Sequence, residues 1–185
     1  MADSLAPGLL IAVPHLLDPN FHRSVVLLIE HGEQGALGVV VNRPSKLKVG
    51  EVLEKLGVGY EGDPEARVLV GGPVQPESGM VIHAEGNAPG DSRPVTDSIF
   101  VGSSLAALGR LFNRQGTRAL FLLGHAGWGA GQLEGEIEAG AWIPAPADEA
   151  LIFGADRPGL WDRALREQGI DPRLLVRGDS DTGTN

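Results

Sequence analysis

The chain has 185 residues and carries 24 acidic against 15 basic side chains, which gives a formal net charge of −9. This length suits one domain with a core large enough to fold without disulfide or metal support. The sequence contains no cysteine, which excludes disulfides, thiolate catalysis and cysteine-ligated zinc or iron–sulfur sites. We expect one domain over residues 1–177 and a polar, frayed tail over residues 178–185.

The same composition limits location and partners. The first ten residues lack the basic and apolar stretches of a secretory signal, and the apolar runs are far shorter than the roughly 20 residues of a membrane helix. We therefore expect a soluble, cytoplasmic protein without membrane contact. The negative charge disfavours direct binding of nucleic acid, because an acidic surface is repelled by phosphates. A basic face would have to be built from Arg43, Lys46, Lys48, Arg110, Arg114 and Arg118.

Three apolar runs near the start predict strands. Gly8–Val13 predicts the first, ended by Pro14. Ser24–Ile29 is apolar and rich in β-branched residues, which is typical of a strand covered on both faces. Gly38–Val41 predicts its return strand, and the short connection between the two favours an antiparallel pair.

The middle of the chain mixes a helix with short strands. Lys48–Leu56 has apolar residues at helical spacing. Val68–Val70 and Met80–His83 predict strands on either side of the tight turn Gly71–Pro76, and the polar segment Asn87–Pro94 predicts a mobile surface loop.

The next stretch predicts a strand at Ile99–Val101 and then a helix that begins with Ser103 or Ser104 as its cap. Ala119–Leu123 predicts a buried strand, followed by a glycine-rich turn over Gly124–Gly131.

The last third predicts a short helix at Gln132–Ala139, a last strand at Leu151–Phe153 and a final helix at Gly159–Gly169. The strands and helices do not alternate regularly. An α+β fold with a mixed, partly closed sheet and flanking helices is therefore favoured over a doubly wound parallel sheet.

The glycine-rich segment from Gly124 to Glu134 is the most unusual part of the sequence. Glycines at positions such as Gly127 would let backbone N–H groups approach an anionic ligand closely. The dinucleotide-binding pattern fails, however, because Gln132 stands where it needs a third glycine. Alternatively, the glycines permit a tight turn under Trp128 and carry no chemistry.

Three glutamates stand at the end of this segment and just after it, at positions 134, 136 and 138, and Glu134 is closest to the glycines. With a histidine or Arg43, Glu134 could form an acid–base pair for hydrolysis, whereas a solvated helix face explains all three glutamates without any chemistry. The polar turns containing Asp18, Asn20 and Asn42 can bond their own backbone. Alternatively, these turns have a functional role, in which Arg43 beside them binds an anion or pairs with Glu134.

Five segments together resemble the AlgH/YqgE family of bacterial proteins, from Gly8 to about Leu174. They are Gly8–His31, Gly35–Pro44, Val70–His83, Gly124–Ile143 and the FG…LW…ALREQGID region that follows. The resemblance implies a largely antiparallel, bifurcated sheet that forms a pseudo-barrel flanked by helices. It implies no cofactor and no catalytic residues. Family members are linked genetically to transcriptional regulation of exopolysaccharide genes.

Three functions are compatible with the sequence. The leading hypothesis is a non-enzymatic regulatory domain that binds a small anionic ligand or a protein partner. A hydrolase using Glu134 with a histidine or Arg43 is the second, and a regulator acting on nucleic acid, directly or through a partner, is the third. We expect neither a metal site nor a catalytic site, and the candidate binding residues are Asp18, Asn20, Asn42, Arg43, Gly127, Trp128, Gln132 and Glu134.

Overall fold

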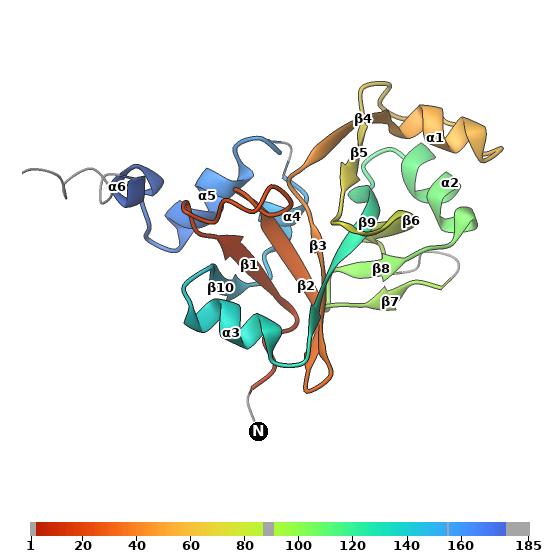
Figure 1. Cartoon of the computed structure of the whole chain (residues 1–185). Coiled ribbons are helices and arrows are strands. Elements are labelled where there is room, and N and C mark those ends of the chain that lie inside the picture. The colour runs from red at the N-terminus through yellow and green to blue at the C-terminus, as the bar shows by residue number, and fades with distance from the viewer. Residues whose placement is uncertain (1–2, 87–90, 155, 177–185) are drawn as a thin grey trace, which may run out of the picture.

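The computed structural model describes residues 3–86, 91–154 and 156–176, which contain ten strands and six helices (Figure 1). The first half of the sheet has the strand order β10-β1-β2-β3, and every pair in it is antiparallel. Its members are β1 (Gly8–Ala12), β2 (Val25–Gly32), β3 (Gly35–Val40) and β10 (Trp142–Pro146). The antiparallel pair that the sequence predicts at β2 and β3 is confirmed, with Val26 opposite Val40.

The second half of the sheet is built on β9 (Ala119–Gly129), the longest strand. Its early residues pair antiparallel with β6 (Val74–His83) and parallel with β5 (Arg67–Val70), and its late residues pair antiparallel with β3. The sheet therefore divides at β9, which confirms a mixed, largely antiparallel, bifurcated sheet. The remaining strands extend the second half: β4 (Pro44–Lys48) beside β5, β8 (Phe100–Gly102) beside β6, and β7 (Arg93–Pro94) beside β8.

The glycine-rich turn predicted over Gly124–Gly131 is wrong, because β9 continues through this segment to Gly129. Gly124 has a positive φ of 77°, and a Cβ atom on it would lie 2.4 Å from the carbonyl oxygen of Gly72. Gly71 links the branches, since its N–H donates to Leu123 O and its oxygen accepts from Val40 N. These glycines thus allow two backbones to cross where the sheet divides.

Two predictions near the C-terminus are also wrong. The last strand predicted at Leu151–Phe153 is the helix α4 (Glu149–Ile152), and the side chain of Asp148 accepts a hydrogen bond from Leu151 N at its start. Short apolar runs fit a buried strand and a buried helix equally well. The helix predicted as the final one is α5 (Leu160–Glu167), but α6 (Pro172–Val176) follows it.

Two predicted segments lie partly or wholly outside the described residues. The loop expected at Asn87–Pro94 contains residues 87–90, which are not described, and its end forms β7. The tail expected over residues 178–185 is likewise outside them.

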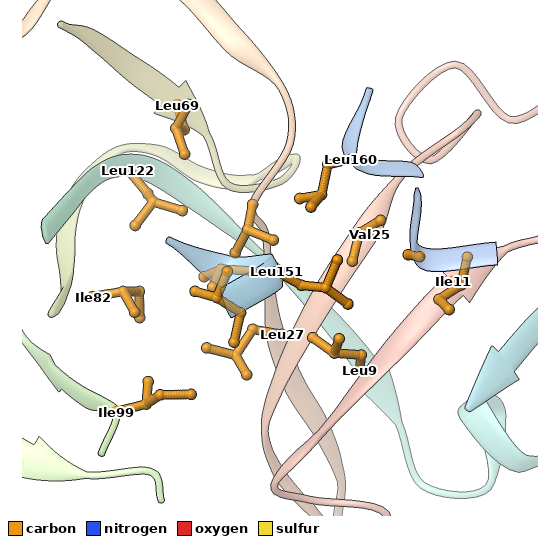
Figure 2. Close-up of a cluster of buried hydrophobic side chains, with 14 of the residues drawn as sticks. Leu9, Ile11, Val25, Leu27, Leu69, Ile82, Ile99, Leu122, Leu151 and Leu160 are labelled. Carbon is orange, nitrogen blue, oxygen red and sulfur yellow. The ribbon is translucent and has the colours of Figure 1, made fainter. Parts of the chain in front are cut away.

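Alternate residues of β1 and β2 face two different core clusters, as expected for strands covered on both faces. On one side, Val25 and Leu27 join a cluster that also contains Leu122 of β9 and Leu160 of α5 (Figure 2). On the other side, α3 (Gln132–Glu138) packs over a smaller cluster that contains Trp128. A third cluster joins the second half of the sheet to α1 (Val49–Lys55) and α2 (Leu105–Asn113).

Candidate functional site

Arg43 follows β3, and its guanidinium binds backbone carbonyl groups of the loop between β1 and β2. Its Nη1 donates to the carbonyl oxygens of Asn20 (2.5 Å) and Pro19 (3.2 Å), and its Nη2 donates to that of His22 (3.0 Å). The guanidinium thereby satisfies carbonyl groups that have no strand partner. The pairing of Arg43 with Glu134 considered from the sequence is wrong, because Arg43 binds this loop and Glu134 bonds to a histidine.

The other polar turn residues have the same local role. Asn42 Oδ1 accepts from Val25 N (2.9 Å), and its Nδ2 donates to Arg23 O (2.9 Å), so this side chain fixes the start of β2. Asp18 Oδ1 accepts from Asn20 N (2.8 Å) within the loop. Asp18, Asn20, Asn42 and Arg43 do lie together: the side chains of Asp18, Asn42 and Arg43 bond to the backbone, as the simpler interpretation of these turns predicts, and Asn20 takes part through its backbone N–H and carbonyl.

Trp128 lies in a cluster of three aromatic rings at the end of β9. Its ring stacks on Phe21 at a centroid distance of 6.1 Å and meets Trp142 edge-on at 6.0 Å, while Phe21 contacts Trp142 at 5.5 Å. Phe21 belongs to the loop that Arg43 holds, so it joins the two groups of candidate residues. Trp128 itself is buried, and its neighbour Gly127 is exposed.

Glu136, which the sequence does not distinguish from its neighbours, organises this cluster. Its Oε2 accepts from the indole N–H groups of Trp128 (3.0 Å) and Trp142 (2.8 Å). Its Oε1 accepts from Gln132 Nε2 (3.1 Å), and Gln132 Oε1 accepts from Gly129 N (3.0 Å). The two tryptophans come from different strands, so their common acceptor emerges only when β9 and β10 are in place.

Glu134, which also lies on α3, forms a hydrogen bond with His31 of β2. His31 Nδ1 accepts from Leu5 N (3.0 Å), so Nε2 carries the proton and donates to Glu134 Oε1 (2.8 Å). Hydrogen bonds from its own backbone N–H and then from His31 lower the pKa of Glu134. The pair is therefore a carboxylate and a neutral imidazole, and it ties the segment before β1 to α3.

A second buried histidine, His83 of β6, was not singled out by the sequence. Its Nε2 bonds to Ser92 Oγ (2.9 Å), and its ring stacks on Phe100 at 5.7 Å. Burial lowers the pKa of His83, which keeps the ring neutral near pH 7. The described residues contain no group of three histidine, aspartate or glutamate side chains able to hold a metal ion.

An apolar groove of about 820 Å³ lies between α1, α2 and β6. Its walls include Leu47, Val52, Leu56, Leu108, Phe121 and Leu123. Leu47 and Leu56 are 41% and 45% exposed, so both leave apolar surface open to solvent beside the groove. The helical spacing of Leu56 suggests a buried position, and the sequence carries no signal that this residue ends beside an open groove.

The polar groups of the groove are few and lie among these apolar walls. They are Lys55, Glu77 and Ser103. Among the ion pairs of the described residues, none includes Lys55 or Glu77.

No described helix has both the length and the apolar composition needed to cross a bilayer.

Comparison with known proteins places this architecture in a family. A UPF0301 protein of Myxococcus xanthus is 44% identical over 176 residues, which cover 95% of this chain and 97% of that protein. The solution structure of AlgH from Pseudomonas aeruginosa matches with a TM-score of 0.75 and 34% identity, covering 100% of this chain and 98% of that one. Protein DIP2367 of Corynebacterium diphtheriae matches with a TM-score of 0.75 and 27% identity, covering 92% and 91%.

The family model described as AlgH-like matches residues 9–173. That range contains both groups of candidate residues, the groove and the branching strand β9. The chain belongs to the AlgH-like family.

Proposed function

We propose that this chain is a non-enzymatic binding domain, and that the groove between α1, α2 and β6 takes a small amphipathic molecule. One observation carries the proposal: a groove of about 820 Å³ with apolar walls and two half-exposed leucines at its side. Small-molecule sites typically occupy roughly 300–1,000 Å³ and combine apolar walls with a few polar groups. Lys55 and Ser103 supply groups suited to a polar or anionic head.

A hydrolase built on Glu134 has less support. A general base must reach its substrate with an available lone pair. The side chain of His31 is 4% exposed, its Nδ1 accepts from Leu5, and its Nε2 donates to Glu134. Both ring nitrogens are thus committed within the protein, which favours a structural pair.

Direct binding of nucleic acid also has little support, because four of the six basic residues it would need have other partners. Lys48 pairs with Glu65, Arg114 pairs with Glu85, and Arg118 pairs with Glu149. Arg43 bonds to backbone carbonyls. A role in regulation would then operate through the bound ligand, and the cysteine-free sequence favours a reducing, cytoplasmic setting.

The groove can be tested with anilinonaphthalene sulfonate, a fluorescent dye with an apolar body and an anionic head. We expect saturable binding to the wild type. Leu47→Glu and Leu56→Glu should each lower the affinity about tenfold, because a carboxylate then lies against the apolar wall. Leu17→Glu is the matched control, since Leu17 is 76% exposed in the loop after β1.

Equal dye affinity in the wild type and the two groove variants, with all proteins folded, would refute the groove as the binding site. Weaker binding in Leu17→Glu to the same degree would show a general effect of charge instead.

A further inference from the structure

Arg157 lines a second cavity, of about 360 Å³, whose lining contains none of the candidate residues described above. Arg157 belongs to the segment between α4 and α5. The opposite walls come from β4, β5 and β9, with Pro44, Arg67 and Phe121 among them. Phe121 also lines the groove, so the two hollows share one aromatic side chain.

Two backbone carbonyls fix the guanidinium of Arg157 from one side. Its Nη1 donates to Val41 O (3.1 Å), just beyond β3, and to Ile152 O (2.5 Å) at the end of α4. These bonds stabilise the last turn of α4 and use only Nη1 of the three guanidinium nitrogens of Arg157. Across the described residues, Nε and Nη2 of Arg157 have no acceptor. That edge is the fork that binds carboxylate or phosphate through two parallel hydrogen bonds.

The charge of Arg157 also lacks a counterpart. None of the ion pairs formed by the described residues includes it. Burial lowers the pKa of Arg157 to about 10, so the group stays charged at neutral pH. A half-buried cation without an acidic partner is costly, and a bound anion offsets that cost.

The lining as a whole is positive, although the protein is acidic. Arg67 contributes a second guanidinium, held by its Nη1 on Lys46 O (2.8 Å). Glu65 is a carboxylate in the same lining: its Oε1 accepts from Lys48 Nζ (2.9 Å), and its Oε2 lies 4.0 Å from Arg67 Nη2 in a loose ion pair, so the two arginines of the lining still exceed its one carboxylate. The rest of the wall is mainly apolar and includes Phe112 and Phe121.

We propose that the Arg157 cavity binds a small molecule that carries one carboxylate or phosphate group on a compact apolar body. The Nε–Nη2 edge of Arg157 receives the anionic group, Arg67 adds a second positive charge, and the apolar body packs against the phenylalanines. This site goes beyond the groove assigned above, which needs neither arginine.

Calorimetric titration with phenyl phosphate, benzoate and neutral benzyl alcohol tests the proposal. The two anions should bind saturably, more weakly at high salt, and the alcohol should not bind. The stronger of the two anions identifies the head group. Arg157→Lys should lose about tenfold in affinity, because an ammonium keeps the charge and loses the fork. Arg67→Gln should also weaken binding, and it leaves the carbonyl contacts of Arg157 intact.

Arg93→Gln is the matched control, since Arg93 lies on β7 and pairs with Glu30 at the surface. It should bind the anions as the wild type does, and so should Leu56→Glu, which weakens dye binding at the groove and lies outside the lining of the Arg157 cavity. The proposal fails if benzyl alcohol binds as well as benzoate, or if Arg93→Gln weakens binding as much as Arg67→Gln. It also fails if no anion binds to wild-type protein that still binds the dye, a result that would leave the groove unaffected.

Discussion

Trp128 donates its indole N–H to Oε2 of Glu136 over 3.0 Å, and the same oxygen accepts from Trp142. One carboxylate on α3 thus holds side chains from β9 and β10, which lie at different positions in the sheet. This contact joins the helix to the sheet through a charged acceptor, the stronger kind of hydrogen bond.

Glu136→Ala should therefore destabilise the fold. Hydrogen bonds to charged groups contribute roughly 1.5–3 kcal/mol, so we expect a loss of about 2–3 kcal/mol in the free energy of unfolding, measured by urea titration. Tryptophan emission should shift to the red as both indoles lose their acceptor. Glu138→Ala, on the exposed side of the same helix, should change stability by less than about 0.5 kcal/mol. Equal effects of the two substitutions would contradict the role of Glu136.

The bond between Glu134 and His31 should be visible in the pH dependence of stability. Because the pKa of Glu134 is lower in the folded state than in the unfolded chain, its contribution is present above the unfolded pKa. That contribution is lost as the pH falls through the folded pKa, from about pH 4.5 downward. Glu134→Gln should consequently lose less stability than the wild type between neutral and acid pH. Parallel acid-unfolding curves for the two proteins would show that the bond contributes nothing.

Gly124 and Gly127 lie on the same strand, but substitution by alanine should destabilise the protein at Gly124 and have little effect at Gly127. Gly124 has a φ of 77°, and its Cβ would meet a carbonyl oxygen at 2.4 Å, so Gly124→Ala should cost about 2–4 kcal/mol or prevent folding. The nearest atom to a Cβ on Gly127 is 4.0 Å away, so Gly127→Ala should be close to neutral. Urea titration or soluble yield separates the two. A tolerant Gly124 would contradict the crossing at the division of the sheet.

Arg43 should act on the loop between β1 and β2 and leave the sheet intact. Removing its contacts in Arg43→Ala should cost about 1–3 kcal/mol and speed amide exchange in Asp18–Arg23. Arg43→Lys should rescue little, because one ammonium cannot reach three carbonyls as the planar fork does. Arg110→Ala, an exposed change on α2, is the control. Unchanged exchange in the loop would mean that it is held by other contacts.

The sequence predicts those parts of the fold whose pattern is local. The apolar runs at β1, β2 and β3 identify strands, and the helical spacing of α1 and α5 identifies helices. The sequence does not predict that β9 continues to Gly129, because Gly124 resembles a turn residue. Only the structure shows that Gly124 lies against the backbone of Gly72. The three apolar residues Leu151–Phe153 do not distinguish a strand from a helix.

The candidate site is predictable to a lesser degree. The backbone contacts of the polar turns around Asn42 and Arg43 follow from their residue types, but none of the eight candidate binding residues lines the groove or the Arg157 cavity. Glu136 and Arg157 are missed, because their partners come together only in the folded sheet. No periodic pattern marks an arginine whose acceptors are the ends of β3 and α4.

The shared strand β9 has a mechanical consequence. Phe121 and Trp128 lie on one unbroken strand, with the groove beside the first and the aromatic cluster around the second. A hinge between the two branches would have to break β9 itself, so we infer that the branches melt together in a single calorimetric transition. Because β9 is continuous, Trp128 lies only seven residues from Phe121 on the same strand. A ligand in the groove that displaces Phe121 should therefore change the fluorescence of Trp128.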